Sequence, residues 1–480
     1  MKWEVVIGLE IHVQLKTNSK LFCRCSTKFS HEANSNICSV CIGMPGVLPV
    51  LNKQAVENAI KLGLATNCTI NKVNEFARKN YFYPDLPKGY QISQFDKPIC
   101  LKGNLEVSTD DGTKAVGITR IHIEEDAGKL VHQGSDNIKG ATSSLSDLNR
   151  SSVPLLEIVS EPDIRSAKQA KAYMEKIHQI IRYLDISDGN MEEGSMRCDA
   201  NISIRKKGDP KLGTRTEVKN LNSFKAIERA INIEVERQID ILEDGGTIVQ
   251  ETRHYNEATN STKSLRSKEE AHDYRYFPDP DLVPLNISDK WIENIKKSMP
   301  ELPSTLKKRY LTDYGLNDYD AELMTLDLFT ANLFEETSKL SGKPKEVANW
   351  LMGDITKYLN ANNLELKQTK ITPQNLTKII ESIDNKTISR KIAKQIIPDI
   401  LEKDIDPKII VKEKGLTQIT ETGAIEKTIR EVLDENPKAV QDIKDGKQQT
   451  IGFLIGQVMK KTSGKANPQI VRETIINLTS

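Results

Sequence analysis

Three adjacent carboxylates end a stretch that alternates like a β-strand, and such a group of acids could hold a metal ion. The stretch, residues 117–129, reads GITRIHIEEDAGK, and its acids are Glu124, Glu125 and Asp126. Adjacent carboxylates repel one another unless a cation lies among them, and such oxygen ligands are the ones that Mg²⁺ prefers. A solvated acidic loop is the alternative. The alternation predicts one strand face with Ile118, Arg120, His122 and Glu124, and the other with Ile121 and Ile123.

A second strand-like stretch near the N-terminus carries compatible ligands. Residues 5–15 read VVIGLEIHVQL, in which apolar and polar residues alternate as in a half-buried strand. Glu10 and His12 therefore project from the same face, with Cα atoms about 6.6 Å apart. Alone, they are better explained as an ordinary surface pair than as metal ligands. Taken with Glu124 and Glu125, they predict one shared divalent-metal site.

Four of the seven cysteines form two close pairs on either side of a short loop. Cys23 and Cys25 are separated by twelve residues from Cys38 and Cys41. Thiolates with this spacing suit a tetrahedral Cys₄ zinc site, a knuckle spanning residues 23–41. The first pair is tighter than the usual C-x-x-C, so four unlinked thiols are the alternative. A glutaminase-type nucleophilic cysteine fits less well, because no histidine or asparagine can be assigned to it.

Residues 77–95, ARKNYFYPDLPKGYQISQF, are dense in aromatics for a chain with only 5% aromatic residues. Pro84 and Pro87 stiffen the segment and remove ladder hydrogen bonds, which predicts a loop. Such a loop either walls a cleft, with Lys79 pointing inward, or packs on its own rings at the surface. Composition alone does not distinguish the two.

Further polar candidates accompany strand-like runs in the middle of the chain. Residues 153–159 predict a buried strand, in a segment whose candidate pocket residues are Arg150, Ser151 and Glu157. In residues 196–205 one face is apolar, and the other carries Arg197, Asp199, Asn201, Ser203 and Arg205. That strand is either solvent-exposed or lines a polar cleft. The remaining candidates are Glu193, as a further oxygen ligand, and Glu217, Lys219 and Arg275.

The elements that hold these residues predict an α+β half followed by an all-helical half. Helices are expected at 167–184, capped by Ser166 with Gln169, and from Asn222 or Ser223 to 243. Beyond residue 287 helical periodicity replaces the strand signals. The helices expected there span 291–310, 320–340, 347–359, 373–383, 389–401, 424–436, 437–444 and 450–461, with 405–413 as a charged connector. The prediction is a mixed, largely antiparallel sheet-and-helix domain at 1–290 that carries the site, an all-α domain at 291–405 and a small α-helical tail domain at 411–480.

Chain-wide charge is balanced, since 68 basic residues face 67 acidic ones in 480 residues. No global field therefore drives nucleic-acid binding, and a local patch is required. After residue 445 the tail carries Lys447, Lys460, Lys461, Lys465 and Arg472 against Glu473, which either grip a phosphate backbone or form a solvated face. No stretch reaches the ~18 apolar residues of a membrane span, and no signal or transit features are evident, so a cytoplasmic protein is expected.

Seven blocks of this sequence resemble the B-subunit family of the tRNA-dependent amidotransferases. They are VIGLEIHVQL, ARKNYFYPDLPKGYQISQF, IHIEEDAGK, LLEIVSEPDIRS, EEGSMRCDANISIR, EVKNLNSF and DYRYFPDPDLVPL. The resemblance implies an enzyme that uses ATP to phosphorylate the side-chain carboxylate of Glu-tRNA(Gln), Asp-tRNA(Asn) or both. Ammonia then displaces the phosphate, which gives Gln-tRNA(Gln) or Asn-tRNA(Asn).

The resemblance also implies residue roles. Mg²⁺ is assigned to Glu10, His12, Glu124 and Glu125, with Glu193 and Asp199 as additional candidates. The catalytic candidates are Glu10, His12, Lys79, Glu125, Arg197 and Asp199. The substrate- and nucleotide-binding candidates are Tyr81, Tyr83, Lys88, Tyr90, Arg150, Ser151, Glu157, Asn201, Glu217, Lys219 and Arg275. The first four of these, with Lys79, fall in the block that lines the family's ammonia tunnel. Zinc at Cys23, Cys25, Cys38 and Cys41 is expected to be structural.

The expected partners follow from the resemblance and from motifs that the sequence lacks. There is no Walker A motif and no GxGxxG after a strand, so ATP binding rests on the resemblance alone. The amidase signature is also missing, so a partner must supply ammonia; the resemblance implies that this partner is an amidase-type glutaminase A subunit, with a small C subunit as the third component. tRNA(Gln) and tRNA(Asn) are expected to bind through the tail. A small-molecule carboxylate–amine ligase and a non-catalytic zinc-containing tRNA-binding scaffold are the alternatives; the basic tail argues against the first and the internal polar strands against the second.

Overall fold

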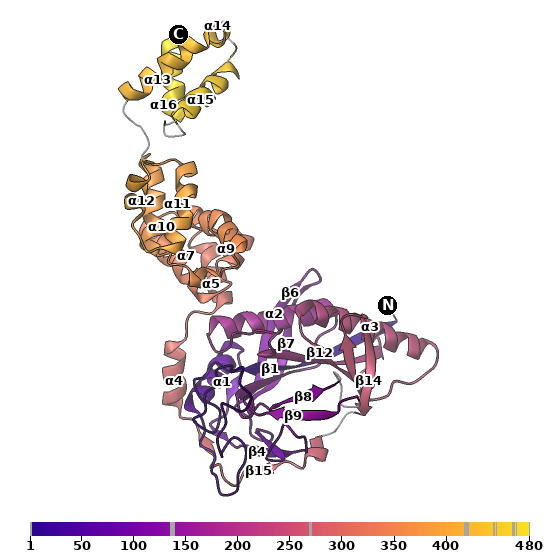
Figure 1. Ribbon diagram of the computed structural model, residues 1–480. Helices are drawn as coiled ribbons and strands as arrows, with labels where there is room; N and C mark the ends of the chain where they lie inside the picture. The colour runs from indigo at the N-terminus through magenta and orange to yellow at the C-terminus, as the bar shows by residue number, and fades with distance from the viewer. Residues whose placement is uncertain are drawn as a thin grey trace. The chain divides into compact units, whose positions relative to one another are not determined.

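In the computed structural model, β1 lies at the centre of a nine-stranded sheet (Figure 1). The strands run in the order β14 (Ser261–Ser267), β13 (Glu251–Asn256), β12 (Thr216–Leu221), β11 (Met196–Lys206), β1 (Trp3–Gln14), β10 (Pro154–Ser160), β7 (Gly112–Glu125), β6 (Cys100–Thr109) and β2 (Thr69–Ile70). Neighbours are antiparallel except β12 and β13, which are parallel. The predicted α+β fold with a mixed, largely antiparallel sheet is therefore confirmed.

The structure describes residues 2–134, 140–267, 271–416, 422–444, 447, 449–462, 466 and 468–479. The chain divides into two units, Met1–Leu302 and Pro303–Ser480. The finer three-domain division stays a prediction.

Apolar side chains of the central strands point to one face of the sheet, where helices cover them. Ile7, Leu9 and Ile11 of β1 are at most 1% exposed, and they share one core with residues of α1 (Lys53–Ala65), α2 (Ala167–Tyr183) and α3 (Phe224–Glu243). Figure 1 shows α2 and α3 on the same side of the sheet. Ser166 and Ser223 cap these two helices, as predicted. Because side chains alternate along a strand, the polar residues of the same strands lie on the opposite face.

One prediction about β7 is wrong. The pairing of β7 with β10 shifts register, because Val159 pairs with Arg120 whereas Ser160 pairs with Ile118. This β-bulge places one extra residue between them and reverses the alternation. Ile118 therefore joins Ile121 and Ile123 in the core instead of sharing the face of Arg120.

Short strands lie beside the main sheet. They form a three-stranded sheet of β15 (Phe277–Pro278), β4 (Ala77–Asn80) and β5 (Tyr90–Ser93), a pair of β16 (Leu285–Asn286) with β3 (Val73–Asn74), and a hairpin of β8 (Lys129–Gln133) with β9 (Ser143–Asp147). A 3₁₀ turn, η1, spans Ala271–Tyr274. The loop predicted for 77–95 is wrong at residues 77–80 and 90–93, because β4 and β5 pair there.

Two of the predicted helices are each divided into two. The first becomes α4 (Asp289–Ser298) and α5 (Pro303–Thr312), since Pro300 and Pro303 lack the N–H that a continuous helix needs. The second becomes α6 (Asp318–Leu323) and α7 (Leu328–Ser341), because Asp327 starts a new helix by accepting a hydrogen bond from Thr330 N at 2.9 Å. The charged connector is also wrong: Asp406 caps α12 (Pro407–Glu413).

The other helices of the second unit begin and end close to the predicted residues. The helix predicted at 347–359 is a succession of α8 (Pro344–Trp350), the π-helix η2 (Leu351–Ile355) and α9 (Thr356–Asn362), and the next two are α10 (Pro373–Asp384) and α11 (Arg390–Glu402). The 3₁₀ turn η3 (Leu366–Gln368) was not predicted. The tail contains α13 (Thr422–Glu435), α14 (Pro437–Lys444), α15 (Gln449–Lys461) and α16 (Pro468–Thr479), of which the last was not predicted. Tail residues such as Ile429, Leu454 and Val471 form a core of their own. Among the helices in the described part of the chain, none has the length and apolarity of a membrane span.

Candidate active site on the polar face of the sheet

The register of five strands brings charged residues together on the face opposite the helices. Glu10 pairs with Asp199, His12 pairs with both Arg197 and Glu157, and Glu157 pairs in turn with His122. Residues paired across an antiparallel ladder point to the same side. We call this surface the polar face; its residues are Glu10, His12, His122, Glu124, Glu157, Arg197, Asp199, Asn201, Glu217 and Lys219.

His12, Glu124 and Glu157 form the first of two groups on the polar face that could hold a cation, since their ligand atoms lie within 4.8 Å of one another. His12 Nε2 is 3.4 Å from Glu157 Oε2 and 3.8 Å from Glu124 Oε1. His122 Nε2 lies 3.5 Å from Glu157 and 3.6 Å from Glu124, and Ser93 Oγ donates to Glu124 at 3.2 Å. Imidazole nitrogen with carboxylate oxygen is a donor set that divalent metals accept.

The charges of this group shift one another's pKa values. Burial lowers the pKa of His12, but the hydrogen bond and charge of Glu157, with Glu124 and Asp199, raise it to about 9. Burial raises the pKa of Glu157, but the charges of His122, His12 and Lys79 hold it well below its usual value. Without a metal, this group is therefore a protonated imidazole between two ionised carboxylates, and a cation must displace that proton to bind His12.

Glu10, Asp199 and Glu217 form the second group. Asn201 Nδ2 donates to Glu10 Oε1 at 2.9 Å, and Thr252 Oγ1 donates to Glu217 at 2.8 Å. Lys219 Nζ lies 2.6 Å from Asp199 Oδ2 and 3.7 Å from Glu217. Burial lowers the pKa of Lys219, but the charges of Asp199 and Glu217 raise it to about 12. Three carboxylates from three adjacent strands form an all-oxygen donor set, which suits a hard cation.

The expected single metal site of Glu10, His12, Glu124 and Glu125 is therefore corrected to two groups. Glu10 lies with Asp199 and Glu217, while His12 lies with Glu124 and with Glu157, which was expected only as a binding residue. Glu125 follows Glu124 in the strand and points to the opposite side, where its carboxylate contacts Lys88 and accepts from Ile92 N at 2.9 Å. Glu193 is exposed in the turn before β11 and belongs to neither group. The β-strand period explains why Glu124 and Glu125 separate.

Lys79 of β4 lies near the His12–Glu124–Glu157 group, whose carboxylates act on its charge. Burial lowers the pKa of its ammonium, but the charges of Glu124, Tyr276 and Glu157 raise it above the usual value. The ammonium is 4.8 Å from the ring centroid of Tyr274 and 5.9 Å from that of Tyr81, and Tyr81 donates to Gln91 Oε1 at 3.2 Å. Segments far apart in sequence thus supply an aromatic wall beside a buried cation.

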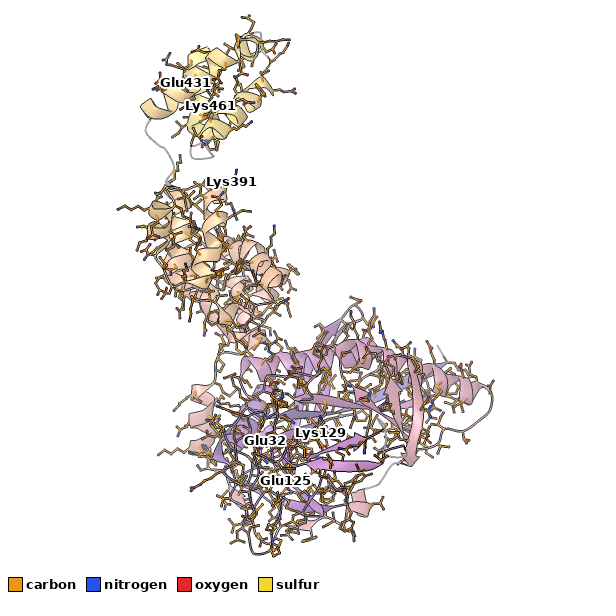
Figure 2. All side chains as sticks on the ribbon, viewed as in Figure 1. Glu32, Glu125, Lys129, Lys391, Glu431 and Lys461 are labelled. Carbon is orange, nitrogen blue, oxygen red and sulfur yellow. The ribbon has the colours of Figure 1, made fainter. Side chains whose placement is uncertain are left out.

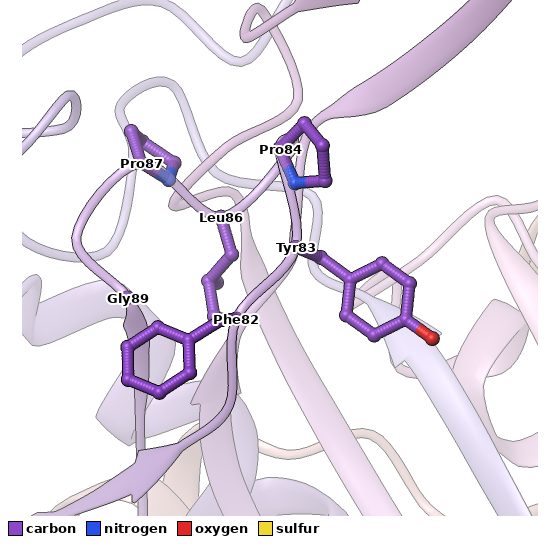
Figure 3. Close-up of a pocket in the computed structure, with 6 residues that line it drawn as sticks. All are labelled: Phe82, Tyr83, Pro84, Leu86, Pro87 and Gly89. Carbon is purple, nitrogen blue, oxygen red and sulfur yellow. The ribbon is translucent and has the colours of Figure 1, made fainter.

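The loop after β4 lines a shallow, open pocket of about 350 Å³ (Figure 3). The ring of Phe82 lies against Gly89, and the ring of Tyr83 extends away from that of Phe82. Gly89 has φ +74°, a conformation that glycine adopts without strain. The ring centroid of Tyr90 lies 4.2 Å from the guanidinium of Arg78, which pairs with Asp279 at 2.9 Å. Lys79 and Tyr81 face the polar groups, since, beside the effect of burial, the charge of Glu124 raises the pKa of both, and the ring of Tyr83 packs edge-on against Tyr81 at 6.3 Å.

Asp126 closes one end of the polar face and was not among the predicted site residues. It accepts from Arg197 at 3.0 Å and from Gln14 at 2.6 Å, and it lies 3.5 Å from Arg150. Burial raises its pKa, but Arg197 and Arg150 lower it below the usual value. Its place at the end of the alternating acidic stretch was the available signal. His122 was missed as well, although the period of β7 placed it beside Glu124.

Two predicted binding residues lie elsewhere. Ser151 is buried and donates to Cys41 O at 3.2 Å, so it contacts the knuckle. Arg275 is exposed with φ +47°, and its carbonyl accepts from Asn80 at 2.9 Å. Their assignment as binding residues stays a prediction.

The four cysteines of residues 23–41 come together as the spacing predicted. Their sulfur atoms lie within 4.8 Å of one another, and Cys38 Sγ is 4.0 Å from Cys41 Sγ. Two sulfurs of a tetrahedral zinc site with 2.3 Å bonds are about 3.8 Å apart. Cys41 Sγ also accepts from Cys38 N at 3.2 Å, and a hydrogen bond from Cys23 together with the charge of Lys20 lowers the pKa of Cys41. The donor set and its spacing fit Zn²⁺.

The tail is less basic than its lysines suggested, because acids lie beside them. Lys461 is 2.5 Å from Glu435 and 3.8 Å from Glu431. Figure 2 labels Lys461 and Glu431. Lys447 is 2.9 Å from Asp442. Lys460 and Arg472 are exposed, and Lys465 lies outside the described residues.

Comparison with known proteins identifies the family. The GatB/GatE catalytic domain matches residues 5–293, and the GatB domain matches residues 332–478. The B subunit of the aspartyl/glutamyl-tRNA(Asn/Gln) amidotransferase of Geotalea uraniireducens is 56% identical over 476 residues, which cover 99% of each chain. The corresponding protein of Carboxydothermus hydrogenoformans is 53% identical over 99% of this chain and 98% of its own. Because these matches extend over nearly the whole chain, it belongs to the B-subunit family of the aspartyl/glutamyl-tRNA(Asn/Gln) amidotransferases.

Proposed function

We propose that the polar face carries out the ATP-dependent half of transamidation. ATP transfers its terminal phosphoryl group to the side-chain carboxylate of Glu-tRNA(Gln), Asp-tRNA(Asn) or both, and ammonia then displaces phosphate to form the amide. A carboxylate is a poor acyl donor until its oxygen becomes part of a phosphate leaving group, so phosphorylation comes first. The observation that carries this proposal is the pair of carboxylate groups, His12–Glu124–Glu157 and Glu10–Asp199–Glu217, side by side on one sheet face.

The chain's own residues have distinct tasks in this reaction. The two carboxylate groups would hold Mg²⁺, which neutralises phosphate charge during phosphoryl transfer. Lys79, Arg197 and Lys219 are cations on or beside the polar face that orient anionic substrate oxygens. The aromatic wall around Lys79 excludes water, which would otherwise compete with ammonia for the activated carboxylate.

Ammonia is proposed to come from an amidase-type glutaminase A subunit in a complex that also contains a small C subunit. Residues Lys79, Tyr81, Tyr83, Lys88 and Tyr90 lie on the segment proposed to receive it. Zn²⁺ in the knuckle is proposed to be structural, because four cysteine ligands leave no open position for a substrate. We place the reaction in the cytoplasm.

The tail, residues 411–480, is proposed to bind tRNA(Gln) and tRNA(Asn) by shape and backbone contacts. Its independent core supports a separate binding module. Its eleven basic and nine acidic residues leave only a small net positive charge, so contacts must come from exposed cations such as Lys460 rather than from a general field.

The test is an assay of the chain with its partner subunits on both misacylated tRNAs. Expected are ATP- and tRNA-dependent amide formation with free ammonium, and glutamine use only when the A subunit is present. ATP consumption without tRNA would favour the small-molecule ligase. Binding of tRNA without phosphorylation or amide formation would favour the non-catalytic scaffold.

A further inference from the structure

Lys20 is completely buried, although it carries an ammonium group. Its Nζ lies 3.6 Å from Cys41 Sγ and 3.3 Å from the carbonyl oxygen of Leu148. Burying an ammonium is strongly unfavourable unless an anion compensates its charge. With the hydrogen bond from Cys23, Lys20 itself helps to lower the pKa of the Cys41 thiol, and four thiolates around one Zn²⁺ keep a net negative charge that compensates the ammonium more strongly than one sulfur and one carbonyl do. The position of Lys20 therefore matches a metal-loaded knuckle.

The same lysine contacts a segment that is fastened to the knuckle. We call residues 146–152 the strap. Asn34, from the loop between the cysteine pairs, donates to Ser146 O at 3.1 Å and accepts from Leu148 N at 2.8 Å. Asn149 donates to Glu32 O at 2.7 Å, and Ser151 donates to Cys41 O at 3.2 Å. The fold of the knuckle thus determines where the strap lies.

The strap carries Arg150 to the end of the polar face. Arg150 Nε donates to Ala127 O at 3.0 Å and lies 3.5 Å from the carboxylate of Asp126. Ser152 N also donates to Asp126 O, at 2.9 Å. Asp126 in turn binds Arg197 and Gln14. A continuous set of contacts therefore leads from Cys41 through Lys20 and the strap to Arg197.

We propose that Lys20 is a positioning residue that couples zinc in the knuckle to the strap. Its ammonium donates both to the Cys41 sulfur and to the Leu148 carbonyl, so zinc binding holds Arg150 against Asp126. The inference rests on the proposed zinc site. It differs from a purely structural role, because a lysine that only fills space would stabilise the chain equally with and without zinc.

The first measurement is zinc release from the full-length chain to a chromogenic chelator. Lys20→Met keeps the length of the side chain and removes its charge. Groups that support metal ligands typically change metal affinity about 10–100-fold, so we expect release at least about tenfold faster. Lys28→Met is the matched control, since Lys28 is an exposed lysine of the same knuckle, and it should release zinc as the unchanged chain does. The gain in melting temperature on zinc loading should likewise shrink only in Lys20→Met.

The second measurement is amide hydrogen exchange in the strap, with and without zinc. Removing zinc from the unchanged chain should speed exchange at Leu148 and Ser152, and in Lys20→Met zinc should no longer slow it. If Lys20→Met does not fold, the same two measurements are made on Lys20→Gln, and exchange in the strap is compared in the unchanged chain with and without zinc. The role of Lys20 is overturned if Lys20→Met and Lys28→Met release zinc at the same rate, or if hydrogen exchange in the strap is the same with and without zinc. A chain that binds no zinc overturns the zinc site and this coupling together.

Discussion

The knuckle and the polar face both gather metal-ligating side chains, but they do so by different routes. The knuckle takes all four sulfurs from residues 23–41, whereas the polar face takes its ligands from strands β1, β7, β10, β11 and β12. Ligands close in sequence are brought together by a turn and can be read from their spacing. Ligands on separate strands meet only through the order and register of the sheet. Residue spacing therefore predicts the ligands of the knuckle, whereas the ligands of the polar face depend on the sheet topology.

The two regions also differ in how their charge is balanced before a metal binds. On the polar face each carboxylate group already has cationic partners, His12 and Lys79 in one group and Lys219 in the other. In the knuckle Lys20 is a buried cation beside the sulfurs. A metal on the polar face must therefore compete with the protein's own cations for the carboxylates. In the knuckle, by contrast, the ammonium of Lys20 compensates the negative charge that remains on the thiolates when a metal is bound.

The largest expected effect comes from removing one carboxylate charge from each polar group. Glu10→Gln and Glu157→Gln keep the size of the side chain but weaken the hold on the phosphoryl charge. We expect each to lower tRNA-dependent phosphorylation about 10²–10³-fold, as for loss of one preorganised electrostatic contact. The measurement is single-turnover transfer of labelled phosphate from ATP.

Glu106→Gln is the matched control for these substitutions. Glu106 is an exposed acid of β6 in the same sheet, and its replacement should leave the rate unchanged. If only one of the two groups responds, the polar face has a single metal position; if neither does, the assignment of the reaction to this face is wrong.

The next effect concerns the knuckle and should stay local. Cys38→Ser removes a ligand, and we expect bound zinc to fall below about a tenth per chain, because structural zinc binding is part of the folding free energy. Atomic absorption measures the metal, and thermal unfolding measures the stability lost. Cys68→Ser, at a buried cysteine outside the knuckle, should keep its zinc. If Cys38→Ser keeps its full zinc content, Cys38 is not a zinc ligand and the assignment of a Cys₄ site to the knuckle is wrong.

Much of the fold and the members of the site could be read from the sequence, and the grouping of those members could not. Strand alternation placed Glu10 beside His12, and cysteine spacing predicted the sulfur cluster. Nothing in the sequence states that β12 lies next to β11, which brings Glu217 to Glu10. The separation of Glu124 from Glu125 follows from the strand period, whereas the run of adjacent acids alone favours a single group. The helix breaks at Pro300 and Asp327 were local signals that periodicity obscured.

A smaller effect tests the balance of charge within the first polar group. The pKa of His12 is raised from 6.5 to about 9, so its ion pair stabilises the fold fully below pH 6.5 and this contribution is lost as pH rises through 9. In Glu157→Gln we expect the pKa of His12 to fall by at least about one unit, since a partner carboxylate shifts a pKa by about that much or more. NMR titration of the histidine ring in metal-free protein measures it. An unchanged pKa would mean that Glu157 does not control His12.

The smallest expected effect concerns the tail, where the charged side chains are exposed to solvent rather than buried as on the polar face and in the knuckle. Lys460 is exposed at the end of α15, whereas the next residue, Lys461, already lies 2.5 Å from Glu435. An ammonium that binds phosphate releases a counterion, so Lys460→Ala should weaken tRNA binding several-fold and reduce the salt slope by about one. Lys461→Ala is the matched control and should change both less, because Glu435 offsets its charge. Filter-binding titrations at several salt concentrations measure both quantities. Equal losses for the two lysines would mean that tRNA displaces Glu435, and no loss for either would place the tRNA contact elsewhere on the chain.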